Sequence, residues 1–238
     1  MSSTGTQING ATALVTGGNR GLGKAVVQEL LDRGAAKVYA TSRSAFTHSD
    51  PRVVTLTLDV TSDASVAAAA QVATDVSILV NNAGIHSSTP VLTAPLDEIQ
   101  GELDANLFGV LRVTRAFAPI LAEHETSSIV NVLSVLSWIS FGTGYEVSKA
   151  AAWSATNGLR LALADQGTTV TGLHVGYMDT DMTAGIDAPK ADPREIARQA
   201  ADAILTGGYE VLADDISHQV KAGLSADVTV LYGQLAAA

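Results

Sequence analysis

The sequence contains no cysteine, and this absence excludes disulfide bonds and thiolate metal ligands. Basic residues are also scarce: 14 Lys and Arg stand against 24 Asp and Glu, giving a formal net charge of −10. A chain with this deficit has no excess of cations to displace counterions from a phosphate backbone, so we expect no nucleic acid partner. No run of about 18 apolar residues suggests a membrane span either.

A targeting signal is missing from the first ten residues. The segment MSSTGTQING has neither the basic start nor the apolar stretch of a signal peptide, so we expect a cytoplasmic protein with no membrane partner. What the sequence does contain is 47% hydrophobic and 16% charged residues over 238 positions, the balance of a globular chain. One well-buried core is the simplest expectation, so residues 1–238 are interpreted as a single domain.

Short β-rich runs alternate with longer helical patterns along the chain. The first helical pattern stops at Gly34, and further helices are expected over residues 97–124 and 145–167. This alternation predicts a parallel sheet covered by helices. The strand-like runs begin at Ala11, Lys37, Val53, Ser77, Ser128 and Thr169.

Residues 16–23, TGGNRGLG, stand between the first predicted strand and the first predicted helix. Glycine permits positive φ and close backbone approach, and the free amides at a helix start attract anions. The three informative glycines, Gly17, Gly21 and Gly23, therefore indicate a site for a pyrophosphate. The alternative is a turn that needs glycine only for tight packing of strand against helix.

The end of the second predicted strand indicates which dinucleotide would bind. An NAD site usually places an acidic residue there for the ribose hydroxyls, whereas this chain has Ser42 and Arg43, with Arg20 in the glycine turn. Guanidinium groups suit the 2′-phosphate of NADP. We therefore predict NADP(H); the alternative for each arginine is an ordinary solvated surface charge.

The glycine turn resembles the TGxxxGxG motif of short-chain dehydrogenases/reductases, and further matches cover nearly the whole chain. Asp59 and Val60 resemble the family's adenine-contacting pair, NNAG at residues 81–84 its structural motif, and YEVSK from Tyr145 to Lys149 its Y-x-x-x-K. Asn106, Ser134 and Thr180 resemble the catalytic asparagine, the catalytic serine and a cofactor-contacting threonine.

The resemblance implies a single-domain doubly wound Rossmann fold of the α/β class, with a mostly parallel seven-stranded sheet. The connection between Thr180 and Pro193 is short, which predicts a short substrate-loop region near residues 180–193. The residues expected around NADP(H) are Gly17, Asn19, Arg20, Gly21, Leu22, Gly23, Ser42, Arg43, Asp59, Val60, Asn82, Ala83, Gly84, Tyr145, Lys149, Gly176, Met178 and Thr180.

The sequence departs from the family pattern in two places. Ser134 precedes Tyr145 by eleven positions where about thirteen are usual, so the loop between them is short and Ser137 is a second candidate for the substrate-contacting serine. Val175 and Gly176 stand where Pro-Gly is common, which predicts a slightly different backbone beside the nicotinamide.

The expected chemistry is hydride transfer between the cofactor and a carbonyl or alcohol carbon. Tyr145 would be the general acid/base, and Lys149, four residues later on one helix face, would stabilise its phenolate. The resemblance assigns a substrate hydrogen bond to Ser134 and a proton-supplying water path to Asn106. The alternatives are a solvated helical pair for Tyr145 and Lys149, a strand-end hydroxyl for Ser134 and a helix-bending amide for Asn106.

The overall prediction is an NADP(H)-dependent oxidoreductase that reduces a ketone or aldehyde, or runs the reverse reaction on a small-molecule alcohol. A catalytically silent NADP(H)-sensing binding protein is the alternative. We expect no metal, because the five histidines have no ligand spacing and the aspartates near Asp181 and Asp214 suit loops or helix caps. The helix after Tyr145 is apolar on several sides, which predicts burial against its own sheet and, in part, against another subunit; the family resemblance implies a homodimer or homotetramer.

Overall fold

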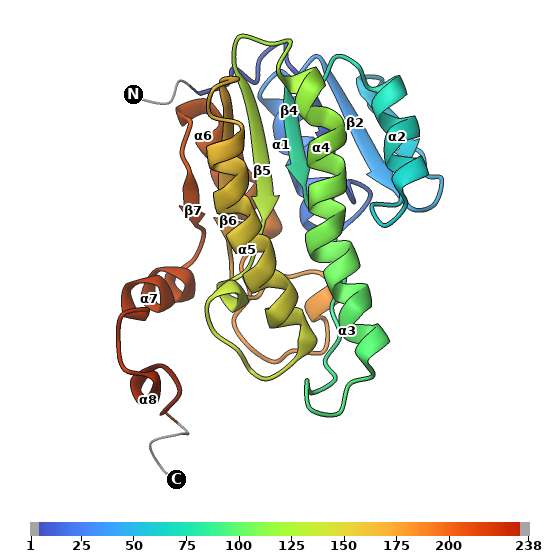
Figure 1. Ribbon diagram of the computed structural model, residues 1–238. Helices are drawn as coiled ribbons and strands as arrows, with labels where there is room; N and C mark the ends of the chain where they lie inside the picture. The colour runs from blue at the N-terminus through green and yellow to red at the C-terminus, as the bar shows by residue number, and fades with distance from the viewer. Residues whose placement is uncertain (1–4, 234–238) are drawn as a thin grey trace.

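Seven parallel strands form one sheet in the computed structural model, which describes residues 5–233. The spatial order is β3-β2-β1-β4-β5-β6-β7, and the direction of winding reverses between β1 and β4 (Figure 1). The prediction of a doubly wound Rossmann fold with seven strands is confirmed. The strands are β1 Thr12–Val15, β2 Lys37–Ser42, β3 Val53–Thr57, β4 Ile78–Asn81, β5 Ser127–Val132, β6 Thr168–His174 and β7 Glu210–Leu212.

Helices cover both faces of this sheet. On one face α1 (Gly21–Asp32) and α6 (Pro193–Thr206) enclose one apolar core with the central strands. On the other face α2 (Asp63–Val72), α4 (Gly109–Leu121) and α5 (Gly144–Ala162) enclose a second (Figure 1). The remaining helices are α3 (Leu96–Leu103), α7 (Asp215–Gly223) and α8 (Val228–Leu231), with short helical turns at Val135–Ser137 and Asp181–Thr183. Residues 1–4 and 234–238 of the predicted domain lie outside the described residues.

The central strands are apolar runs because they are covered on both faces. All four residues of β4 and all seven of β6 are buried, as expected for inner strands of a parallel sheet. The first helix follows the predicted pattern and buries Leu22, Val26, Val27, Leu30 and Leu31.

Two predicted helices differ from the observed ones. The helix expected over residues 97–124 consists of α3, a π-helical turn at Asp104–Phe108 and α4, which ends at Leu121. The helix expected to reach Gly167 ends at Ala162, because Gly167 adopts φ +76° and its amide bonds the carbonyl of Ala164. Local turn geometry therefore divides the first helical stretch and shortens the second relative to its apolar pattern.

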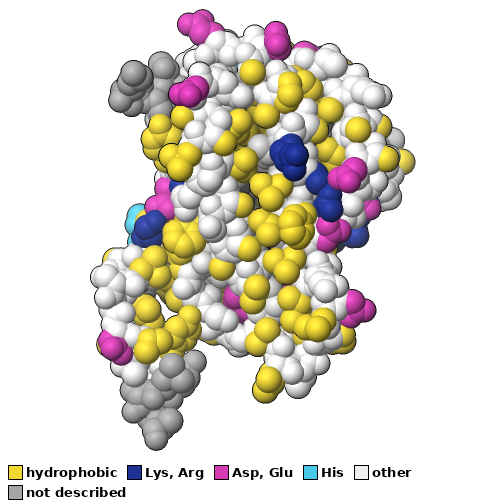
Figure 2. All heavy atoms as spheres, viewed as in Figure 1, with side chains coloured by type: hydrophobic (Ala, Val, Ile, Leu, Met, Phe, Trp, Pro, Cys, Tyr) yellow, Lys and Arg dark blue, Asp and Glu magenta, His cyan; other side chains and the backbone are white. Residues whose placement is uncertain are grey.

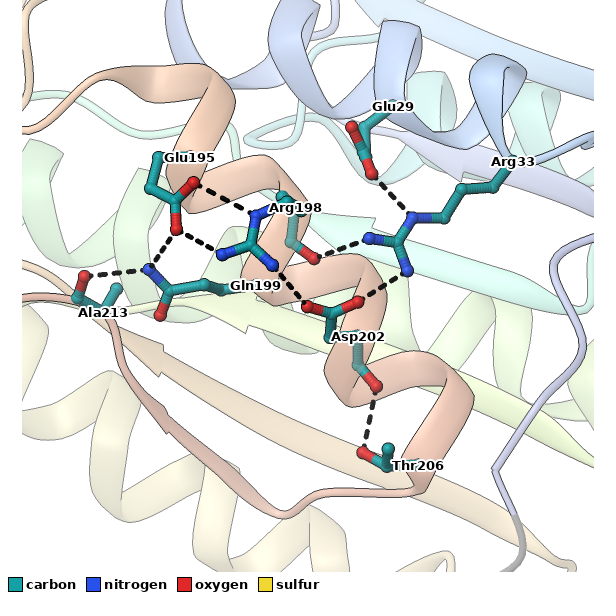
Figure 3. A network of polar contacts seen from close by, with 8 residues as sticks. All are labelled: Glu29, Arg33, Glu195, Arg198, Gln199, Asp202, Thr206 and Ala213. Carbon is teal, nitrogen blue, oxygen red and sulfur yellow. Dashed lines mark hydrogen bonds and ion pairs between the residues drawn. The ribbon is translucent and has the colours of Figure 1, made fainter.

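A charged network joins α1 to α6 on the outer side of the first core (Figure 3). The Arg33 guanidinium contacts Glu29 of its own helix at 2.6 Å, Asp202 of α6 at 2.7 Å and the carbonyl of Arg198 at 3.2 Å. Arg198 in turn pairs with Glu195 and Asp202. This network holds α1 against α6, and the first turn of α1 borders the predicted pyrophosphate site.

The length and apolar character of the helices bear on membrane insertion. Among residues 5–233, none of the helices combines the length and the apolar character needed to cross a membrane.

Candidate active site

The glycine turn, residues 16–23, connects β1 to α1 at the point where the sheet reverses its winding. Gly17 and Gly21 adopt φ of +66° and +51°, which disfavours any side chain there. A Cβ at Gly23 would lie 2.1 Å from the carbonyl oxygen of Gly17, so only glycine permits this packing. Arg20 precedes α1 without a side-chain cap, leaving the first amides of the helix for another acceptor. These features fit a dinucleotide pyrophosphate.

The NNAG segment supports the glycine turn from behind. The Thr16 hydroxyl accepts hydrogen bonds from the amides of Asn82 and Ala83, both at 2.9 Å, and the Asn82 carboxamide donates to the Thr16 carbonyl at 2.8 Å. A Cβ at Gly84 would lie 4.0 Å from the Lys149 Nζ atom. The segment after β4 therefore connects the glycine turn to Lys149.

The ends of β2 and β3 bring Ser42, Arg43 and Asp59 to one edge. Ser42 is buried and its hydroxyl donates to the Ser44 carbonyl at 2.6 Å, whereas Arg43 is exposed. Hydrogen bonds from Thr61 hold the pKa of Asp59 below its ordinary value, and the nearby charge of Arg43 lowers it further. Val60 lies against Gly109 at the start of α4.

Arg20, the second predicted phosphate ligand, has a different partner. Its guanidinium contacts the Asp181 carboxylate at 3.4 Å, and both side chains are largely exposed. The structure therefore separates the two arginines: Arg43 lies at the edge with Asp59, and Arg20 joins the glycine turn to the loop after β6.

Tyr145 lies in the first turn of α5 and is partly exposed. Burial raises the pKa of its phenol well above the ordinary value, and the nearby Glu102 carboxylate raises it further, while a hydrogen bond with the Ser134 hydroxyl has the opposite effect. The phenol is therefore protonated near neutral pH. It can donate a proton.

The structure distinguishes the two candidate serines. Ser134 is the serine whose hydroxyl lowers the pKa of Tyr145; this hydroxyl donates to the Val175 carbonyl at 3.4 Å and accepts from the Leu136 amide at 3.1 Å. The Ser137 hydroxyl instead accepts from the Ser134 amide at 3.3 Å. Ser134 therefore lies beside the phenol, and Ser137 fixes the backbone of Ser134.

Lys149 is buried and its ammonium donates to the Val132 carbonyl at 2.9 Å. Burial lowers its pKa to about 8. The Nζ atom lies 5.6 Å from the centroid of the Tyr145 ring. We expect this ammonium to favour phenolate; in the structure the pKa of Tyr145 is raised by burial and then by the Glu102 carboxylate.

Asn106 lies in the π-helical turn and is 1% exposed. Its carboxamide accepts from the Ile85 amide and donates to the Ile85 carbonyl, both at 2.9 Å. It also donates to the Ser148 hydroxyl at 2.9 Å, which links it to the turn after Tyr145. Asn106 therefore joins the loop after β4 to α5.

The loop after β6 carries the last predicted cofactor residues. The Gly176 amide donates to the Asp214 carboxylate at 2.7 Å, and Met178 forms a β-bridge with Ala191. A Cβ at Gly21 would lie 3.4 Å from the Thr180 methyl group. The loop therefore passes directly beside the glycine turn. Asn19 is exposed at the tip of that turn, and Leu22 packs into the core.

Sequence reasoning missed the buried titratable residues that shape this site. Glu102 accepts from the Ser87 amide at 2.6 Å, Glu146 accepts from the Thr143 amide at 2.7 Å, and His174 contacts the Ser134 carbonyl at 3.2 Å. The pattern T-x-x-E at residues 143–146 is a capping-box signal that could have revealed Glu146. Asp214, predicted to suit a helix cap, caps α7.

Comparisons with known proteins agree with this geometry. The family model described as short chain dehydrogenase matches residues 11–191. The 3-oxoacyl-(acyl-carrier-protein) reductase FabG of Vibrio cholerae is 30% identical over 218 residues, covering 82% of this chain and 89% of that protein.

Solved structures are similar over most of the chain as well. A short chain dehydrogenase from Burkholderia cenocepacia J2315 in complex with NADP is 37% identical, with a TM-score of 0.88 and coverage of 97% and 99% of the two chains. The NADPH-bound carbonyl reductase from chicken fatty liver is 25% identical, with a TM-score of 0.77 and coverage of 82% and 91%. The predicted cofactor agrees with both. The chain thus belongs to the short-chain dehydrogenase/reductase family of oxidoreductases.

Proposed function

We propose that this protein is an NADP(H)-dependent oxidoreductase that reduces a ketone or aldehyde to an alcohol, or catalyses the reverse reaction. The observation that carries this proposal is the placement of a protonated Tyr145 phenol against Ser134, with Lys149 one helical turn away. The glycine turn fits a dinucleotide, and the NNAG segment connects it to this pair.

NADPH, when bound, supplies the hydride. Amides of the glycine turn would hold its pyrophosphate, and Arg43 its 2′-phosphate. Lys149 and Thr180 would hold the nicotinamide half, as the family resemblance implies.

Tyr145 and Ser134 would act on the carbonyl oxygen. Ser134 donates a hydrogen bond to that oxygen, and Tyr145 transfers its proton as negative charge develops there. Because the pKa of Tyr145 is raised, the phenol is in its donating form over a wide pH range. Alcohol oxidation requires the phenolate, so it is expected to be favoured at alkaline pH.

The relatives support reduction of a carbonyl group without agreeing on the rest of the substrate. One is named a 3-oxoacyl-(acyl-carrier-protein) reductase and another a carbonyl reductase. Both names describe the same chemical step, which is the step proposed for this chain.

A homodimer or homotetramer in the cytoplasm, built from single-domain chains, is part of the same proposal. Figure 2 shows hydrophobic side chains gathered over the face that α4 and α5 form. Phe108, Val147 and Leu161 are 49%, 46% and 82% exposed. Apolar surface of this kind is typical of a contact between subunits.

Replacing the phenol tests the proposed chemistry. Tyr145→Phe removes the proton donor, and general acids contribute about 100-fold to 10,000-fold to rates, so carbonyl reduction should fall by about that factor. The affinity for NADPH, measured by fluorescence titration, should remain nearly unchanged. A variant that keeps most of its turnover would contradict the role of Tyr145.

The same assay addresses the silent binding protein. A wild-type chain that binds NADPH but oxidises it with no ketone or aldehyde in a broad panel would favour that alternative.

A further inference from the structure

The loop between β4 and α3 runs past the reacting groups in a fixed order. It starts at Asn82, bonded to the glycine turn, and passes Lys149 at Gly84. It then reaches Pro90, which forms a β-bridge with Thr143, two residues before Tyr145. The loop therefore contacts the glycine turn first and Lys149 second, and residues 85–89 follow on the side of Tyr145.

His86 lies in this part of the loop and contacts Tyr145. The two ring centroids are 4.8 Å apart and the planes meet at 69°, an edge-to-face arrangement. The His86 side chain is exposed, whereas the Lys149 ammonium is buried. His86 therefore borders the solvent-facing approach to the phenol.

Buried side chains fix the backbone on both sides of His86. The preceding residue, Ile85, has both its amide and its carbonyl bonded to Asn106 at 2.9 Å. The amide of the following residue, Ser87, donates to Glu102 at 2.6 Å. Asn106 and Glu102 are each 1% exposed, so two core side chains hold the imidazole in place beside Tyr145.

The imidazole is available to a ligand. Within residues 5–233 no side chain or backbone group hydrogen-bonds either ring nitrogen of His86. A neutral imidazole offers one donor and one acceptor. The nearby acidic groups are Glu102 and Glu98, and the latter bonds the Ser87 hydroxyl. These carboxylates disfavour an anionic substrate group beside His86, and they tolerate a neutral one.

We propose that His86 is a specificity-determining residue that binds a second, neutral oxygen of the substrate, one or two carbons from the reacting carbonyl. This inference rests on the proposed function, because it takes Tyr145 as the group that holds the reacting oxygen. The short distance between the two rings requires that the two oxygens belong to neighbouring parts of one small molecule. A 3-oxo ester satisfies this requirement, whereas a simple ketone has no group for His86.

The test compares two substrates of equal chain length, ethyl 3-oxobutanoate and heptan-2-one. His86→Phe keeps a ring against Tyr145 and removes both nitrogens, so kcat/KM for the oxo ester should fall about tenfold or more while that for heptan-2-one changes less than about threefold. His86→Gln restores a donor and an acceptor and should recover part of the loss. His124→Phe, which changes a histidine outside this loop, is the matched control.

Equal losses on the two substrates would overturn the proposal, because they would show that His86 only packs against Tyr145. Unchanged kcat/KM on both would overturn it as well. A wild-type enzyme that reduces neither compound, nor any ketone or aldehyde in the broad panel, would contradict the proposed function instead. Calorimetric binding of ethyl 3-oxobutanoate to the NADPH complex would then decide: weaker binding by His86→Phe supports the His86 contact, and equal binding rejects it.

Discussion

The candidate active site has a predicted nucleotide side, residues 16–23 and 42–43, that differs in construction from its proposed substrate side, residues 85–91 and 134–146. The nucleotide side depends mainly on backbone: glycines with positive φ, close packing of Gly23 on Gly17 and an uncapped helix start. The substrate side consists of loops that buried side chains hold, among them Glu102, Glu146 and Asn106. Substitutions that add atoms should therefore impair the nucleotide side, and substitutions that remove side-chain atoms should impair the substrate side.

The largest expected effect on cofactor binding follows from adding one methyl group on the nucleotide side. In Gly23→Ala the new Cβ would lie 2.1 Å from the Gly17 carbonyl oxygen and 2.5 Å from the Asn82 nitrogen. Overpacking of this kind costs about 3 kcal/mol, so NADPH affinity should fall about 100-fold or more, as a fluorescence titration would measure. Gly158→Ala, where an added Cβ meets nothing within 4 Å, is the control. Unchanged NADPH affinity in Gly23→Ala would place the pyrophosphate elsewhere.

A second prediction concerns His174, which is fully buried and contacts the carbonyl of Ser134, the proposed substrate-binding serine. Burial lowers its pKa to about 4 from the ordinary 6.5, so the unfolded chain binds a proton that the folded chain does not. Stability present above pH 6.5 is therefore lost as the pH falls towards 4, by on the order of 3 kcal/mol. His174→Gln should remove this part of the pH dependence in urea denaturation.

A variant of Trp138, the residue stacked on His174, distinguishes a loss of packing from a change in protonation. Trp138 lies 3.8 Å from the His174 ring, centroid to centroid, and Trp138→Phe should lower stability to a similar degree at each pH. If His174→Gln loses as much stability on acidification as the wild type does, another group titrates in this window.

A smaller effect is expected from a deletion on the substrate side. Glu146 accepts hydrogen bonds from the amides of Thr143 and Phe141 at 2.7 and 3.2 Å. Glu146→Ala leaves these donors without their acceptor, which should lower the free energy of unfolding by about 2 kcal/mol. It should also lower kcat/KM for a ketone while NADPH affinity stays unchanged. Glu146→Gln, which retains an acceptor oxygen, should be milder; an equal loss of NADPH affinity would remove the distinction between the two sides.

The smallest expected effect is a selectivity change at Arg43, where a side chain rather than backbone acts on the nucleotide side. Arg43→Asp should weaken NADPH binding about tenfold, because at this exposed position a charge-assisted hydrogen bond to the 2′-phosphate is worth about 1.5 kcal/mol. NADH binding should change little. Similar, small changes for both cofactors would show that Arg43 is only a surface charge.

The same contrast explains what could be predicted from the sequence. The glycine turn occupies eight consecutive residues between a strand and a helix, so its role could be inferred locally. Glu102 and Ser87 lie fifteen positions apart, and no spacing rule joins them. The choice between Ser134 and Ser137 also stayed open, because the direction of each hydroxyl depends on how a 3₁₀ turn folds between them.

The π-helical turn at Asp104–Phe108 determines which directions the side chains before and after it face. Glu102 faces the active site and Leu121 faces the core, nineteen positions later. In an uninterrupted α-helix, with roughly 100° per residue, these two side chains would diverge by roughly 100°. A π turn absorbs one extra residue, so the remaining eighteen steps make about five whole turns and both residues point inward. Forcing the same residues into a regular α-helix would turn one of the two faces away from the molecule, whereas deleting one residue here would leave a regular helix with both faces inward.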